Sequence, residues 1–146
     1  MDNFELVKAT SRDMDFLFRL RKITMDEHLQ RAGVFLDDEQ HQQRVQDLFE
    51  HSFIIRHNNQ HMGMIKYVTT DRHISIKQIQ ILPAHQGQGL GRRVIEFFIQ
   101  QAKQQQKDLI LTVLKDNPAQ KLYQRLGFAY VGEDELEFHM KLQNAV

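Results

Sequence analysis

The stretch IQILPAHQGQGLGRRVIEFFI, residues 79–99, decides the fold. It starts at the end of an apolar run, turns at Pro83, carries glycines at 87, 89 and 91, and continues with apolar residues at helical spacing. Glycine adopts backbone conformations closed to other residues and lets a ligand approach the main chain closely. Because the first amides of a helix lack intrahelical acceptors and carry the positive end of its dipole, this strand, loop and helix suit a phosphate.

Two well-known phosphate loops do not fit the glycine spacing. A Walker A loop has Lys and then Ser or Thr after its last glycine, whereas Arg92 and Arg93 follow Gly91 here. A dinucleotide fingerprint is spaced G-x-G-x-x-G, and this loop has Arg92 where the third glycine would stand. A tight connection with no ligand is the remaining alternative for the glycines.

Composition and charge narrow the class of protein. The chain has 146 residues, of which 41% are hydrophobic and 26% charged, so we expect a single domain over residues 1–146. Basic and acidic residues balance at 19 each, which predicts no broad attraction to nucleic acid or to a membrane surface. The chain lacks both a long apolar run and a signal-like N-terminus, so we expect a cytoplasmic protein.

The absence of cysteine restricts the chemistry. Disulfides, thiolate metal sites and an acyl-enzyme on a cysteine are all excluded. The eight histidines are scattered along the chain, and we expect no metal site.

Apolar periodicity predicts an α/β protein with a mixed, mostly antiparallel sheet of about six to seven strands flanked by helices. A hairpin is expected around Asn58 and Asn59, because both residue types tolerate left-handed turns. Ser11 is the expected cap of the first helix. The expected helices cover 12–24, 25–33, 36–51, 92–107 and 118–126, and the expected strands lie near 4–9, 52–70 (the hairpin), 74–82, 108–114, 128–131 and 136–142.

Two motifs together resemble one family. Residues Gln86 to Gly91 read QGQGLG and match the Q/R-x-x-G-x-G/A loop of the GNAT-type N-acetyltransferases. Downstream, NPAQKLYQRLGF at 117–128 is similar to that family's second signature, in which an asparagine opens a helix, a tyrosine follows and Gly-Phe ends it. The resemblance rests on specific residues over about 74 to 140 and on element order before that.

The resemblance implies a GNAT fold with splayed central strands and acetyl-CoA as cosubstrate. It implies that loop amides hold the pyrophosphate, that strand backbone pairs with the pantetheine arm, and that a backbone N–H polarises the thioester carbonyl. The implied cofactor-binding residues are Ile81, Leu82, Gln86, Gly87, Gln88, Gly89, Leu90, Gly91, Arg92 and Asn117.

Three of the implied roles have structural alternatives. Tyr123 matches the tyrosine that serves as general acid to the thiolate, or it is a buried tyrosine with a structural hydrogen bond. Asn117 is a helix cap in either case. Arg92 faces a phosphate or is an ordinary charge on a wet helix turn.

The general base is where this chain departs from many relatives. Their strand before the loop carries a glutamate, whereas its polar positions here are Lys77, Gln78 and Gln80. Glu27 and His28 lie in the region that helps to form the acceptor site in relatives. Other candidate bases are His73, Glu137, His139 and a water chain to solvent.

The implied activity is direct transfer of an acetyl group to a primary amine of a small molecule or peptide, in a ternary complex. The acids Asp26, Glu27 and 37–39 either attract a cationic amine or are solvated helix ends. A homodimer is possible by the resemblance. The alternative function is a non-catalytic acyl-CoA binding or sensor module.

Overall fold

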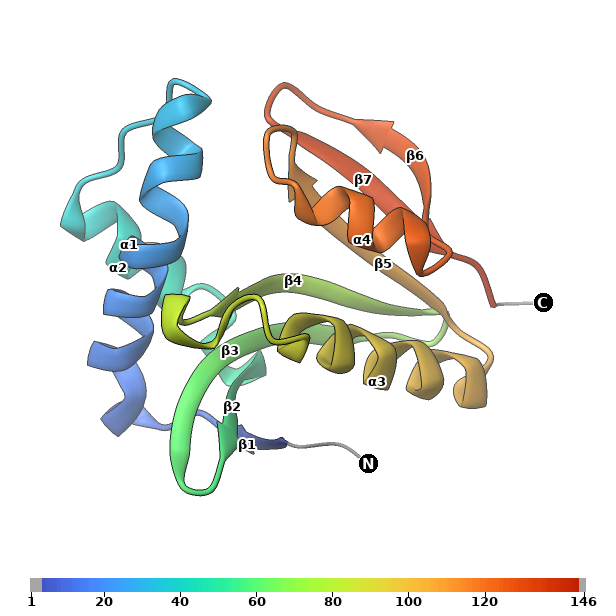
Figure 1. Cartoon of the computed structure of the whole chain (residues 1–146), viewed down its shortest axis with the longest axis horizontal. Coiled ribbons are helices and arrows are strands. Elements are labelled where there is room, and N and C mark those ends of the chain that lie inside the picture. Colours follow the sequence, from blue (N-terminus) through green and yellow to red (C-terminus); the bar gives the residue numbers. More distant parts are fainter. Residues whose placement is uncertain (1–3, 145–146) are drawn as a thin grey trace. The chain divides into compact units, whose positions relative to one another are not determined.

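The computed structural model describes residues 4–144, shown in Figure 1. Within that range the helices are α1 (Met14–Arg31), α2 (Asp38–Gln46), α3 (Leu90–Gln105) and α4 (Ala119–Arg125). The strands are β1 (Glu5–Lys8), β2 (Ser52–His57), β3 (Gln60–Thr69), β4 (His73–Ile81), β5 (Asp108–Leu114), β6 (Ala129–Glu133) and β7 (Glu137–Leu142). Short 3-10 turns lie at Ser11–Asp13, Phe49–His51 and Pro83–His85.

Hydrogen bonds link these described strands in the order β1-β2-β3-β4-β5-β7-β6. β4 and β5 run parallel, whereas β1 with β2, β2 with β3, β5 with β7 and β6 with β7 run antiparallel. The predicted α/β class, with a mixed and mostly antiparallel sheet, is therefore confirmed. Contacts along the chain divide it into two compact units: the described residues up to Lys66 with Gln78–Leu90, and Tyr67–Lys77 with the described residues from Gly91 onward.

The first unit packs α1 and α2 on the sheet formed by β1, β2 and β3. Its core includes Leu17 and Leu20 from α1, Val45 from α2 and Ile54 and Met64 from the β2–β3 hairpin. The hairpin turns as expected, because Asn58 and Asn59 have φ values of 50° and 61°.

A polar network connects α1 to α2 inside this unit. Arg21 donates from Nε to Nδ1 of the fully buried His41 at 3.2 Å, and His41 Nε2 lies 2.6 Å from Asp26. Burial, followed by the nearby Arg44, lowers the pKa of Arg21 to about 10. Hydrogen bonding of these groups is what permits polar side chains in the interior.

Several local expectations in this unit were wrong. The expected pair of helices over 12–33 is one helix, because no glycine or proline interrupts the chain before Gly33. Thr10 and Asp13 cap its 3-10 entry in place of Ser11, with Thr10 N donating to Asp13 Oδ2 at 2.8 Å. The apolar spacing of the expected helix over 12–24 would bury Ile23, but this side chain is 56% exposed. The next helix ends at Gln46, and Leu48 is exposed in a left-handed conformation.

In the second unit, α3 buries the apolar residues that recur at helical spacing along it. Leu90, Val94, Ile95, Phe98 and Ala102 are at most 2% exposed. The first of these five residues, Leu90, is counted with the first unit, and the other four belong to the second. The Phe98 ring also meets Tyr67 edge to face, with ring centroids 4.7 Å apart.

The remaining strands of the second unit form an antiparallel group. β5 pairs with β7 from Leu109 to Leu114, and β7 pairs with β6. The register between β6 and β7 shifts between Tyr130 and Gly132, which is the signature of a β-bulge. Tyr130 Oη donates to Gln120 Oε1 at 2.8 Å and so fastens β6 to α4.

Candidate active site

The glycine loop joins the end of β4 to α3 and is shaped by its own polar contacts. Gln86 donates from its side-chain amide to the Ile81 carbonyl at 2.9 Å, which folds the loop back on the strand end. Gly87 and Gly89 have φ values of 76° and 79°, a conformation that residues with a Cβ rarely adopt. The alternate glycines are therefore required by the backbone path.

The surroundings of the loop leave its main chain accessible. A Cβ built at Gly87 or at Gly91 would have no described heavy atom within 4 Å. α3 starts at Leu90, two residues earlier than expected, so the amides that open the helix belong to the glycine motif itself. These features fit an anionic group placed against the backbone.

The end of β4 shows which main-chain groups are already engaged. Leu82 N donates to Met62 O of β3 at 2.9 Å. Because successive N–H groups of a strand point to opposite edges, the N–H of Ile81 points away from β3. Gly63 permits this close pairing, since a Cβ there would lie 2.3 Å from Gln80 O.

Two arginines open α3. Arg92 lies 3.5 Å from Glu96 in an exposed i,i+4 pair, whereas Arg93 is partly buried. A pair of this kind is worth only a few tenths of a kcal/mol, so the structure does not commit Arg92 to Glu96.

The second motif forms α4 in the second unit. Asn117 Oδ1 accepts the Ala119 N–H at 2.9 Å, which is a capping bond, although the regular helix begins at Ala119. Gly127, with a φ of 106°, ends the helix as expected. Asn117 therefore fulfils the structural half of its expected role.

Tyr123 is buried on α4 and its ring packs near Phe128, with centroids 5.8 Å apart. No group among residues 4–144 makes a hydrogen bond to its hydroxyl. Burial raises the pKa of Tyr123 to about 12, so the phenol keeps its proton at neutral pH.

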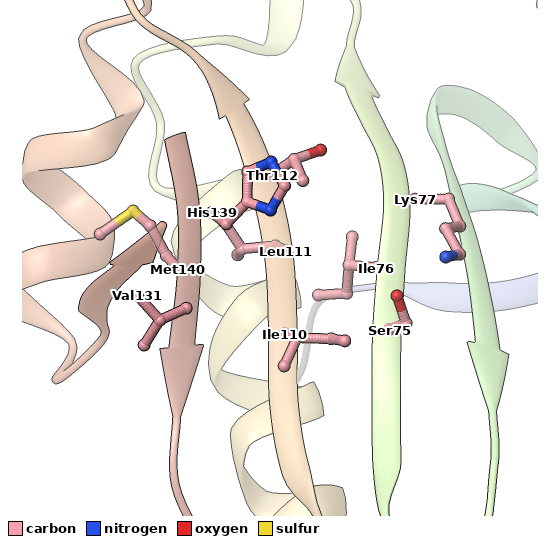
Figure 2. A pocket seen from close by; sticks show the side chains of 9 residues that line it. All are labelled: Ser75, Ile76, Lys77, Ile110, Leu111, Thr112, Val131, His139 and Met140. Carbon is pink, nitrogen blue, oxygen red and sulfur yellow. The ribbon is translucent and has the colours of Figure 1, made fainter. Parts of the chain in front are cut away.

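A groove of about 370 Å³ lies on the strands of the second unit (Figure 2). Its polar lining comes from Ser75 and Lys77 on β4, Thr112 on β5 and His139 on β7, and Ile110 and Val131 add apolar surface. Thr112 and His139 are opposite each other in the β5–β7 register. Cross-strand partners share a sheet face, so their side chains are neighbours.

His139 is held at one end by a carboxylate. Its Nε2 lies 3.0 Å from Asp134 Oδ2, while Asp134 Oδ1 accepts the N–H groups of Leu136 and Glu137 at 2.9 and 2.8 Å. The bond to His139 and then the two backbone bonds lower the pKa of Asp134 to about 2. Asp134 is therefore an anion at all physiological pH values.

A family comparison identifies the domain. The model of the acetyltransferase (GNAT) family matches residues 15–128. The chain belongs to this family. A search of curated protein sequences finds no match.

Solved GNAT-type structures have the same fold at low sequence identity. An acetyltransferase from Thermus thermophilus is 21% identical, with a TM-score of 0.76 over 97% of this chain and 99% of that one. PaiA N-acetyltransferase from Thermoplasma acidophilum, in complex with coenzyme A, is 13% identical, with a TM-score of 0.74 over 96% and 98%. The ribosomal-protein-S18-alanine N-acetyltransferase from Escherichia coli is 18% identical, with a TM-score of 0.72 over 98% and 95%.

The acidic residues expected near an acceptor in this GNAT domain are engaged in local contacts. Glu27 is 71% exposed and pairs with Arg31, and His28 is partly buried on the same helix. Asp37 caps α2 through Gln40 N, and Asp38 binds Lys22 at 2.7 Å. The solvated-helix interpretation accounts for Asp37 and Asp38.

Sequence reasoning missed Ser75 and Thr112 as groove residues. The signal was the alternation with buried neighbours: Ser75 lies between the buried Ile74 and Ile76, and Thr112 lies between the buried Leu111 and Val113, so both face the other way. Which of those residues meet across strands depends on the register, which the sequence does not reveal.

Among residues 4–144, no cluster of three or more His, Asp or Glu side chains is arranged to hold a metal ion. None of the helices in that range has the length and apolar character that a bilayer span requires.

Proposed function

We propose that this GNAT acetyltransferase is an N-acetyltransferase that moves an acetyl group from acetyl-CoA directly to a primary amine, with both substrates bound together. Family membership supports the acetyltransferase part. The observation that carries the cofactor assignment is the loop of residues 86–91, in which two left-handed glycines lead into the first turn of α3.

The residues of the loop fit the diphosphate of coenzyme A. Glycines at 87 and 91 leave open space beside the backbone, and the amides from Gly89 to Arg92 supply donors at the positive end of α3. We assign Arg92 to a phosphate and the outward N–H of Ile81 to the thioester carbonyl. Acetyl-CoA supplies an activated acyl group as a thioester.

Tyr123 is the proposed proton donor to the sulfur of the leaving thiolate. Its raised pKa keeps the phenol protonated at neutral pH, so it has a proton to donate. Asn117 is the proposed second contact to the cofactor from α4. Because the sequence contains no cysteine, attack by the amine itself is the simplest route.

The acceptor is proposed to be an amine on a small molecule or peptide. The Escherichia coli relative acts on an alanine of ribosomal protein S18, which supports a peptide amine among the candidates. Glu27 and His28 remain proposed contacts to the acceptor. We also propose one domain over residues 1–146, a cytoplasmic location and a homodimer.

The test combines binding and turnover. Calorimetry with coenzyme A should show binding to the wild type. Release of free thiol from acetyl-CoA should require an amine from a panel of spermidine, lysine and a short peptide with N-terminal alanine. Tyr123→Phe should lower kcat far more than it weakens coenzyme A binding, and equal kcat in this variant would remove Tyr123 from its role.

A sensor function is the second candidate, because the polar positions of β4 before the loop are Lys77, Gln78 and Gln80 and include no carboxylate. A sensor would bind coenzyme A tightly and release no thiol with any amine of the panel. Absence of coenzyme A binding would contradict both functions.

A further inference from the structure

We infer that His139, held by Asp134, is the general base that takes the proton from the acceptor amine in the groove of Figure 2. The inference rests on the proposed function, because it assumes that an amine is acetylated. It supplies the base that is missing from β4, where the polar positions are Lys77, Gln78 and Gln80.

The hydrogen bonds of Asp134 determine which nitrogen of His139 is basic. Asp134 Oδ2 is a carboxylate oxygen and can only accept, so the contact at 3.0 Å requires the proton of His139 on Nε2. In the neutral ring Nδ1 then carries the lone pair. Among residues 4–144, Nδ1 has no hydrogen-bond partner.

Asp134 itself is fixed in place. Its Oδ1 accepts two backbone N–H groups of the turn before β7, from Leu136 and Glu137. These two bonds restrain the carboxylate, which orients the ring and stabilises the imidazolium that proton uptake creates.

The charges around the groove favour a neutral amine. Lys77 is the cation in the lining, and the described lining residues include no carboxylate that would bind an ammonium. A nearby positive charge disfavours a second one, so the acceptor readily gives up its proton. Of the other charged groups on or near β7, Glu133 pairs with Lys115 at 2.6 Å and Lys141 with Asp108 at 3.8 Å, and Glu137 lies two residues before His139 on the strand.

The groove also exposes His139 to its substrate and to water. The side chain of His139 is 44% exposed, and the opposite residue Thr112 is exposed as well. A base in this setting can receive a proton from a bound amine and pass it to solvent. Thr112, the cross-strand partner of His139, offers a hydroxyl beside the bound amine.

The proton and electron balance is complete without another reactant. Nδ1 of His139 takes one proton from R–NH3+, and the electron pair stays on the amine nitrogen. That nitrogen forms a C–N bond with the acyl carbon. The C–S bond then breaks, and its electron pair stays on sulfur. Tyr123 gives its proton to the thiolate and is reprotonated by the second proton lost from nitrogen, while the first passes from His139 to water.

The main variant is His139→Gln, which keeps polarity and cannot take a proton. With the amine that gives most thiol release, we expect kcat/KM to fall by about 100-fold or more, the usual contribution of a general base. Coenzyme A affinity should not change. His57→Gln on β2 is the matched control, and its kcat/KM should equal that of the wild type.

The pH profile separates a chemical role from a structural one. In the wild type, kcat/KM should decline toward acid because a protonated His139 cannot accept a proton. In His139→Gln the decline that follows protonation of the amine itself should be the one that remains, while Asp134→Asn should give an intermediate kcat/KM. Added imidazole should restore part of the activity of His139→Gly.

A binding readout needs no acetyl-CoA. The 15N resonances of the His139 ring, assigned by their loss in His139→Gln, should shift when the same amine is added to the wild type. This inference would be overturned if His139→Gln had the same kcat/KM as the wild type, or if the His139 ring resonances did not shift when the amine was added. Neither result would contradict the proposed function. Failure of every amine to release thiol would overturn both.

Discussion

Replacing Gly63 with alanine should force β3 away from the end of β4. The new Cβ would lie 2.3 Å from Gln80 O and 3.1 Å from the Ile81 Cα, and ordinary contact begins near 3.4 Å. The two strands must therefore part by about 1.1 Å (3.4 minus 2.3), although Leu82 N and Met62 O are bonded at 2.9 Å beside them. Overpacking costs about 1–3 kcal/mol and a strained hydrogen bond about 1 kcal/mol more.

A loss of about 3 kcal/mol corresponds to a Tm lower by about 10 °C, because unfolding entropy is roughly 2.1 cal/mol/K per residue. Differential scanning calorimetry measures this shift directly. Gly132→Ala is the matched control, since its Cβ would meet nothing closer than the His139 Cβ at 3.9 Å, and its Tm should stay near that of the wild type. A Gly63→Ala protein as stable as Gly132→Ala would refute the close approach of these strands.

Three other perturbations test separate parts of the structure. Lys66 is buried with Nζ donating to the Arg44, Val45 and Asp47 carbonyls, and burial lowers its pKa to about 8. The folded state therefore holds fewer protons than the unfolded state between about pH 8 and 10.5, so wild-type stability should rise with pH there relative to Lys66→Met, as measured by urea unfolding at each pH. Asn117→Ala should cost about 1 kcal/mol in urea unfolding by removing the cap bond to Ala119 N, and an unchanged midpoint would show that the cap is dispensable. Gly89→Ala should cost about 1–2 kcal/mol at its φ of 79° and should weaken coenzyme A binding in calorimetry, whereas intact affinity would contradict a backbone site for the diphosphate.

Expectations from the sequence succeeded where the information is local. The loop of residues 86–91, the turn at Asn58 and Asn59 and the helix stop at Gly127 each follow from the few residues that form them. The buried face of α3 could also be predicted, because helical spacing alone places Val94 and Phe98 on one side of the helix.

Expectations failed where distant residues compete for the same position. Leu48 has the spacing of a buried helical residue, yet α2 ends at Gln46 and Lys66 of β3 takes up the carbonyls near that end. His41 looks like a surface histidine in the sequence, but the bonds to Arg21 and Asp26 permit its full burial. The contact between Lys66 and the end of α2, and the bonds of His41 to Arg21 and Asp26, cannot be inferred from neighbours in the chain.

The sequence alone determined the glycine path between β4 and α3, the order of the elements and the family to which they point, since those features depend on backbone preferences and spacing within a few residues. The tertiary structure alone decided that Thr112 faces His139 and that Asp134 orients its ring. Strand register results from many weak contacts summed across the sheet, and a shift of one residue would turn each of these side chains to the opposite face.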